Sequence, residues 1–114
     1  MTILGTGFGW IETDVGRFEH DIVVFPDGSV GNRYDRLSGS NHEFGLAEAT
    51  AALCGTTADI VLGTGQYGVA TVPDSTRRHL ASCGVQLHVA PTPKAILIYN
   101  ELSVPKCGIF HVTC

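Results

Sequence analysis

The chain has 114 residues, the usual size of one domain, and we expect residues 1–114 to form a single domain. Hydrophobic residues make up 44% and charged residues 16% of the chain, which excludes a disordered polymer. Seven Lys and Arg against eleven Asp and Glu give a formal net charge of −4, which disfavours nucleic acid as a partner. No apolar run approaches the ~20 residues of a membrane span. Residues 1–7 lack the basic flank of a signal peptide, so we expect a soluble cytoplasmic protein with no membrane partner.

Short strands separated by turns are expected in the first part of the chain. Residues 8–12 alternate in the manner of a strand, and residues 17–25 predict a second strand that becomes apolar on both faces toward its end. Turn chemistry at Pro26-Asp27-Gly28 ends this strand, and a hairpin return is expected to begin at Ser29-Val30. Residues 32–39 are polar and predict a loop.

A first helix and a central strand follow. Ser40 and Glu43 fit a capping box, in which the serine oxygen accepts from the Glu43 amide and the Glu43 side chain reaches back. The pattern predicts a helix that runs from there to about Cys54 and stops at Gly55. The apolar run at residues 58–62 predicts a central strand.

Strands and helices alternate through the rest of the chain. Residues 73–83 predict a second helix, and residues 85–90 predict a strand. Thr92 is expected to be the N-cap of a third helix, which Pro105 stops. Residues 108–114 predict the last strand. This alternation after a β-rich start predicts an α/β fold.

A glycine-rich segment follows the predicted central strand. Gly63, Gly65 and Gly68 match G-x-G-x-x-G, but the next helix starts only at Pro73, and the strand at residues 85–90 does not end on a carboxylate that could bind ribose. A dinucleotide site is therefore disfavoured, and we expect no cofactor. Two interpretations stay open, a turn that lets backbone pack closely and a nest that binds a small anion. The ligand-binding candidates of the second interpretation are Gly63, Thr64, Gly65, Gln66, Tyr67, Gly68 and the nearby Arg77.

No catalytic residue is predicted. His20 and Asp21 look like a catalytic pair, but neighbouring residues of a strand point to opposite faces and do not form a dyad together. There is no G-x-S-x-G elbow, and neither a serine nor a cysteine has an identifiable base beside it. We expect the four cysteines to be reduced thiols that serve as small apolar side chains.

No metal site is predicted either. Cys107, His111 and Cys114 are clustered, but in a continuous strand His111 and Cys114 lie on opposite faces, which argues against a shared ion. His79 and Cys83 share a face of the second helix, but two ligands do not complete a zinc site.

The third helix has an unusual outer face. Its buried stripe is formed by Ala95, Ile98, Tyr99 and Leu102. Leu97 falls on the opposite face beside Lys94 and Glu101, and Ile96 lies on the flank. An apolar residue in this place is either covered by another part of the chain or offered to a partner. The candidate interface is therefore Lys94, Ile96, Leu97 and Glu101.

Several short segments together resemble a known family. They are 7–9 (GFG), 20–28 (HDIVVFPDG), 60–65 (IVLGTG), 72–73 (VP), 91–95 (PTPKA), 99–102 (YNEL) and 111–114 (HVTC). In their order and spacing the chain resembles the Mth-nine-three-eight-like domain family, whose members include the adipogenesis-associated Mth-domain protein and mitochondrial complex I assembly factor 3. The resemblance implies a three-layer α/β fold around a mixed, mostly parallel sheet with one antiparallel strand. It implies no established reaction, and the assembly or regulatory roles of eukaryotic relatives suggest binding rather than turnover.

Two functions follow as hypotheses. The preferred one is a non-enzymatic binding or assembly-factor-like domain that contacts a protein partner, or a second copy of itself, through the third helix. The alternative is a small-molecule or anion-binding protein, with or without catalysis, that uses the Gly63–Gly68 loop.

Overall fold

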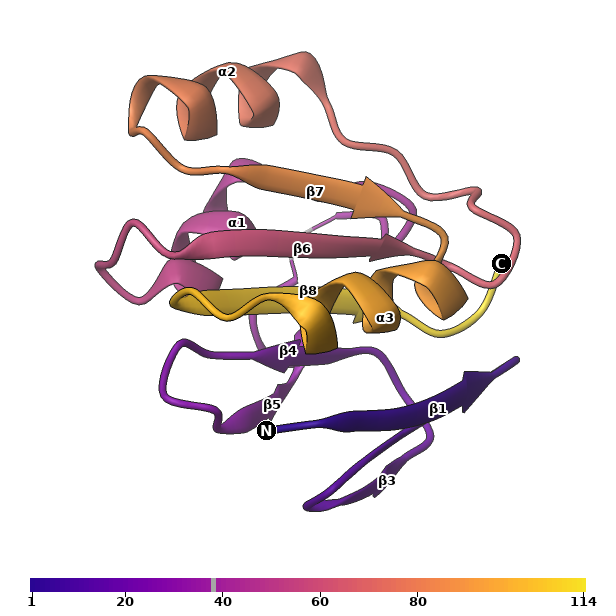
Figure 1. The fold of residues 1–114 in the computed structure, drawn as a ribbon. Helices are drawn as coiled ribbons and strands as arrows, with labels where there is room; N and C mark the ends of the chain where they lie inside the picture. The colour runs from indigo at the N-terminus through magenta and orange to yellow at the C-terminus, as the bar shows by residue number, and fades with distance from the viewer. Residues whose placement is uncertain (38) are drawn as a thin grey trace.

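In the computed structural model, which describes residues 1–37 and 39–114, a five-stranded mixed sheet is flanked by helices and by a separate three-stranded meander (Figure 1). The main sheet has the strand order β5-β4-β8-β6-β7, and the meander has the order β1-β2-β3. The strands are β1 (Ile3–Gly7), β2 (Trp10–Thr13), β3 (Gly16–Phe18), β4 (Ile22–Val24), β5 (Val30–Asn32), β6 (Asp59–Thr64), β7 (Leu87–Ala90) and β8 (Lys106–His111). The helices are α1 (Leu46–Leu53), α2 (Asp74–Ser82) and α3 (Thr92–Glu101), and a 3₁₀ turn, η1, spans Arg33–Asp35.

The directions of the strands agree with the expectation only in part. β6 runs parallel to both β7 and β8, but β4 runs antiparallel to β8 and to β5, and all pairings of the meander are antiparallel. The prediction of a mostly parallel sheet with one antiparallel strand is therefore confirmed only in part. In the main sheet β4 alone runs against the other strands, but two of its four pairings are antiparallel, and with the meander antiparallel pairings are the majority in the described residues. An apolar run such as Ile22–Val24 reports that a strand is covered on both faces, and it does not report the strand's direction.

Both faces of the main sheet are covered. On β6, Ile60 and Leu62 face a core shared with α1 and α2, whereas Val61 faces a core shared with α3 and the meander. Figure 1 shows α1 behind the sheet and α3 in front of it. None of the helices in the described part of the chain is long and apolar enough to cross a membrane.

Several strand boundaries also differ from the prediction. β1 was not predicted, and Phe8 lies in the turn between β1 and β2 instead of starting a strand. The strand expected over residues 17–25 is divided into β3 and β4, because the chain bends at Glu19 and His20. Asp21 follows the bend, and its buried carboxylate accepts a hydrogen bond from the Val112 amide at 2.8 Å. The return at Ser29-Val30 is confirmed by β5.

The predicted boundary of α2 agrees with the structure, and that of α1 does not. α2 agrees with its prediction, but α1 begins at Leu46, well after the expected capping box. The Ser40 hydroxyl accepts from the His42 amide at 3.1 Å, and it is Glu48 whose carboxylate reaches back to the Gly45 amide at 3.3 Å. A glycine therefore precedes α1 as its N-cap, and the acidic partner of the box is Glu48 rather than Glu43.

The ends of α3 are held by buried or half-buried polar side chains. Thr92 is the first residue of the helix instead of its N-cap, since its buried hydroxyl donates to the His111 carbonyl at 2.6 Å and accepts from the Gly65 amide at 2.9 Å. At the other end, the Lys106 ammonium donates to the carbonyls of Tyr99 and Leu102, where a cation is favourable next to the helix carboxyl terminus.

Candidate functional site

A buried network of charged side chains lies behind the carboxyl end of β8. Asp21, Arg33 and His111 are at most 1% exposed, and Glu48 is 5% exposed. They come from the segment before β4, from η1, from the end of β8 and from the first turn of α1. Buried charges are rare unless they are paired, so the contacts of each group decide whether this network is stable.

Arg33 uses every N–H of its guanidinium group. Nε and Nη2 donate to the two oxygens of Glu48 at 2.8 and 3.0 Å, and Nη1 donates to Oδ2 of Asp21 at 2.8 Å. The remaining N–H groups donate to the carbonyls of Asn41 and Glu43, both at 2.9 Å. The side chain thus ties the segment before α1 to η1 and β4, and it leaves no guanidinium donor unsatisfied.

Asp21 orients the histidine at the end of β8. Its Oδ2 lies 2.7 Å from Nδ1 of His111, and its Oδ1 accepts from the Val112 amide. Burial raises the pKa of Asp21, but the hydrogen bonds from His111, Val112 and Arg33 outweigh burial and hold the pKa below its ordinary value. An ionised carboxylate only accepts, so Nδ1 is the ring nitrogen of His111 that donates to Asp21. The Thr113 hydroxyl lies 3.1 Å from Nε2 of the same ring.

Two further side chains meet this histidine at the edge of the sheet. The rings of His42 and His111 are 5.5 Å apart at an angle of 83°, and Sγ of Cys114 lies 3.4 Å from Nε2 of His42. One ligand atom from each of His42, His111 and Cys114 falls within 4.8 Å of the others. We call these three residues the His–His–Cys cluster. The expected separation of His111 and Cys114 is not observed, because β8 ends at His111 and the alternation of strand faces stops there.

The glycine loop forms the wall beside this cluster. The amides of Tyr67 and Val69 both donate to the Cys114 carbonyl at 3.2 Å, and the Gln66 amide donates to the Thr113 carbonyl at 2.7 Å. Gly65 has a φ of +102°, and a Cβ there would lie 2.6 Å from the Cys114 carbonyl oxygen and 2.9 Å from the His111 ring. The loop therefore holds the segment after β8 through close backbone contacts, which is the packing interpretation of the glycines.

The ligand-binding candidates of the loop have different environments. Gly63 and Thr64 are buried within β6, and the amides of Gly65 and Gly68 donate to oxygens of the chain itself. Arg77 is exposed on α2, where its Nε donates to the Val72 carbonyl at 3.4 Å. The loop amides are thus used inside the fold instead of being directed toward an anion.

An exposed apolar surface lies next to the His–His–Cys cluster. Tyr67 is 75%, Phe8 60% and Val69 50% exposed, and the rings of Phe8 and Tyr67 are 6.1 Å apart. The turn that carries Phe8 is fixed against the segment after β8 by a hydrogen bond from the Gly9 amide to the Val112 carbonyl. We call Phe8, Tyr67 and Val69 the aromatic edge.

The outer face of α3 agrees with the sequence interpretation only in part. Leu97 is 58% exposed, and Lys94 and Glu101 are exposed beside it. Ile96, however, is 6% exposed and packs in the core with β1 and β8. Ile96 therefore does not widen the apolar surface, and Leu97 is a single exposed leucine, which is common on protein surfaces.

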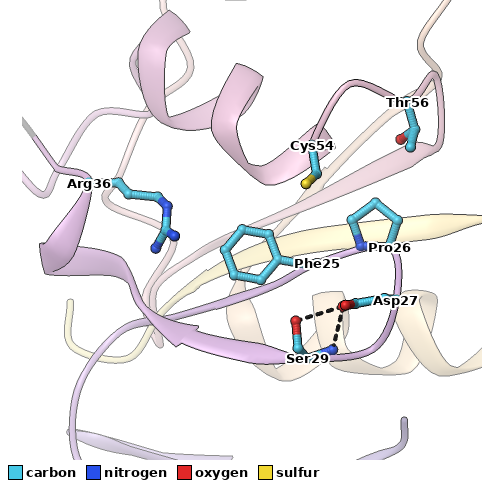
Figure 2. A pocket seen from close by; sticks show the side chains of 7 residues that line it. All are labelled: Phe25, Pro26, Asp27, Ser29, Arg36, Cys54 and Thr56. Atoms are coloured by element: carbon cyan, nitrogen blue, oxygen red, sulfur yellow. Dashed lines mark hydrogen bonds between the residues drawn. The ribbon is translucent and has the colours of Figure 1, made fainter.

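A shallow hollow lies at the opposite end of the strands of the main sheet from the His–His–Cys cluster. The hollow has a volume of about 360 Å³. It is lined by Phe25, Pro26, Asp27, Ser29, Arg36, Cys54 and Thr56 (Figure 2). Cζ of Arg36 lies 4.8 Å from the centroid of the Phe25 ring, and the carboxylate of Asp27 is engaged by the Ser29 amide and hydroxyl. Ligands of open α/β sheets bind outside the carboxyl ends of parallel strands, and in this chain that edge holds His111 rather than the hollow.

His42, Arg33 and Glu48 were not predicted as site residues, and Asp21 was considered only beside His20, where the pair was rejected. In the structure the His20 ring packs against Phe18. A signal was present, since Asp21 directly precedes an apolar strand and His111 lies inside one. A charged or titratable residue inside an apolar run is buried and requires a partner, although the pattern does not reveal which one.

Comparison with known proteins places this fold in a family of α/β domains of unknown function. Residues 3–106 match the family described as Protein of unknown function (DUF498/DUF598), and the chain belongs to that family. This confirms the resemblance seen in the sequence.

Solved structures resemble the chain over almost its whole length. The conserved hypothetical protein PH1505 from Pyrococcus horikoshii OT3 is 28% identical, with a TM-score of 0.88 and 100% of both chains covered. A protein described as MT938 is also 28% identical, with a TM-score of 0.80 over 99% of this chain and 98% of its own. A Bordetella parapertussis protein at 23% identity shares the fold, with a TM-score of 0.78 over 97% and 94% of the two chains.

Proposed function

We propose that this protein is a non-enzymatic binding domain that docks a partner protein through the aromatic edge. The observation that carries the proposal is the pair formed by Phe8 and Tyr67, whose rings touch each other although both side chains are at least 60% exposed. Aromatic residues are enriched at protein interfaces and supply much of their binding energy.

The backbone beneath this pair is fixed in advance. The Tyr67 and Gly68 amides are bonded to the chain itself, and the Gln66 side chain donates to the Thr6 hydroxyl at 3.0 Å, which links the loop to β1. A side chain presented on an ordered loop loses little further conformational entropy when it is buried by a partner. The aromatic edge therefore has the properties of a preorganised contact surface.

The charge of the chain favours a different protein over a second copy. The formal net charge is −4, so two copies repel each other at long range, whereas a neutral or basic partner does not experience that repulsion. The α3 surface expected from the sequence, Lys94, Leu97 and Glu101, remains a second contact surface, but it offers one exposed leucine where the aromatic edge offers three apolar side chains.

The test compares the two surfaces in one assay. Wild type, Tyr67→Ser and Leu97→Ser are immobilised and exposed to extract from the native cell, retained proteins are identified by mass spectrometry, and each is purified and titrated against all three variants. Losing an aromatic hot spot of ~2 kcal/mol weakens binding by roughly 30-fold, which we expect for Tyr67→Ser. Leu97→Ser is expected to bind within about threefold of wild type, as most residues outside a hot spot do.

Three results would contradict the proposal. Equal binding of a purified partner by wild type and Tyr67→Ser would exclude the aromatic edge, and loss only in Leu97→Ser would assign the contact to α3. Sedimentation of the wild type as a dimer that Tyr67→Ser dissociates would make a second copy the occupant.

A further inference from the structure

We propose that the His–His–Cys cluster is a binding site for a zinc-class divalent metal ion, with His42, His111 and Cys114 as the ligands. This site is independent of the docking function, and it depends on contacts that the sequence analysis did not predict.

The distances between the donor atoms of the cluster favour a tetrahedral zinc ion. Nε2 of His42 and Sγ of Cys114 are 3.4 Å apart, and all three ligand atoms lie within 4.8 Å. Two ligands of a tetrahedral zinc ion, with bonds of ~2.0 Å to nitrogen and ~2.3 Å to sulfur, are roughly 3.5 Å apart. The His42–Cys114 edge already has this length, so closing the site requires only a small approach of the third ligand.

The orientation of His111 also favours metal binding. Metal-binding histidines almost always donate their other ring N–H to a carboxylate or carbonyl, which fixes the tautomer and makes the ligating nitrogen more basic. Asp21 takes this part in the cluster, at 2.7 Å from Nδ1. It is itself fixed by Arg33 and the Val112 amide. Because Asp21 uses Nδ1, Nε2 is the ring nitrogen of His111 that is left for the ion.

The groups around the cluster leave it accessible to an ion from solvent. The Thr113 hydroxyl now lies 3.1 Å from Nε2 of His111, but Thr113 is only half-buried and can turn its hydroxyl toward water when an ion binds. His42 is exposed, so an ion can enter from solvent and its fourth position faces water. Two imidazoles and one thiolate suit Zn²⁺ better than Mg²⁺ or Ca²⁺, which prefer oxygen ligands.

The chain contains a matched control. His79 on α2 and Cys83, the C-cap residue of α2, are exposed, and their Nε2 and Sγ atoms are 3.5 Å apart, almost the same distance as between His42 and Cys114. Among the described residues this pair has no third ligand and no buried carboxylate behind it. A chance affinity of any neighbouring histidine and cysteine would therefore appear at both pairs.

The experiment is a calorimetric titration of the whole chain with Zn²⁺ under a non-thiol reductant, with Co²⁺ as a spectroscopic probe. We expect one Zn²⁺ per chain, with binding about 100-fold or more weaker in His42→Ala and in Cys114→Ser, since even partners outside the ligand shell cost 10–100-fold. The sulfur-to-cobalt charge-transfer band should disappear in Cys114→Ser. His79→Ala and Cys83→Ser should bind as wild type does, and circular dichroism should show all four variants folded.

Substoichiometric or absent Zn²⁺ binding by the wild type would overturn the proposal. So would unchanged affinity in either His42→Ala or Cys114→Ser. Loss of binding in Cys83→Ser would assign the ion to α2 instead.

Discussion

Replacing Arg33 with methionine removes the cation that neutralises two buried carboxylates. In Arg33→Met, Asp21 keeps the hydrogen bonds from His111 and the Val112 amide, but Glu48 keeps only the amide of Gly45 at 3.3 Å. Breaking a buried ion pair by removing one partner costs roughly 3–5 kcal/mol. Because a domain of this size is stable by only about 5–15 kcal/mol, we expect a large fall in the free energy of unfolding.

A second replacement, at Glu48, separates two causes of the lower stability: the lost hydrogen bonds of Arg33 and the buried carboxylate that is left without a cation. In Arg33→Met/Glu48→Met the less compensated carboxylate is also gone, so the double variant should be about 2 kcal/mol more stable than Arg33→Met alone. Arg36→Met is the matched control, since Arg36 is exposed and stacks on the Phe25 ring at 4.8 Å. Its loss should cost no more than ~1 kcal/mol.

Urea unfolding followed by circular dichroism measures these differences, and their pH dependence gives a further check. In the wild type the pKa of Asp21 lies below its ordinary value of 3.8, so its contribution is present above that pH and is lost as the pH falls. Protonation relieves the stranded carboxylates of Arg33→Met, so the difference from wild type should narrow in acid. A loss below ~1 kcal/mol in Arg33→Met, or a double variant less stable than the single one, would refute the reasoning.

Two further predictions concern the glycine loop and the cysteines. Gly65→Ala should cost roughly 2–4 kcal/mol, because it combines a positive φ with a clash against backbone, whereas Gly84→Ala, with a φ of +74° and open space around it, should cost only about 1 kcal/mol. Equal thermal shifts of the two variants would contradict this. Burial, followed by the charge of Asp59, raises the pKa of the Cys107 thiol to about 12 from 9.0. Its stabilising contribution is therefore present below pH 9.0 and lost as the pH rises toward 12. A thiol reagent at neutral pH should label the exposed Cys54 and Cys83 but reach Cys107 only on unfolding, and rapid labelling of Cys107 in the folded protein would show that it is not buried.

Local signals in the sequence were sufficient to predict a helix boundary where that boundary depends only on neighbouring residues. The bounds of α2 follow from Pro73 before it and Gly84 after it, and both residues act within one turn of the helix. The capping box at Ser40 was misleading because Glu48, five residues after Glu43, makes the backbone contact and is also held by Arg33. Here a tertiary ion pair decided between two acidic residues that the pattern could not distinguish.

The candidate site depends on contacts between distant parts of the chain. Asp21 and His111 are 90 residues apart, and Cys114 and His42 are 72 residues apart. The order of β4, β8 and β6 in the sheet brings them together, and composition and periodicity do not determine that order. The rule that neighbours in a strand face opposite sides applies to neither place where the sequence argument used it. His20 and Asp21 lie between β3 and β4, and the strand that would carry Cys114 ends at His111.

The proposed zinc site lies at the carboxyl end of β8, where the buried network orients His111 beside His42 and Cys114. The most direct measurement is the anomalous scattering at the zinc edge from crystals grown with one equivalent of Zn²⁺. The account predicts one strong peak bonded to His42, His111 and Cys114, with Asp21 still paired to Nδ1 of His111. A peak at His79 and Cys83, or the absence of an ordered ion at the carboxyl edge, would contradict it.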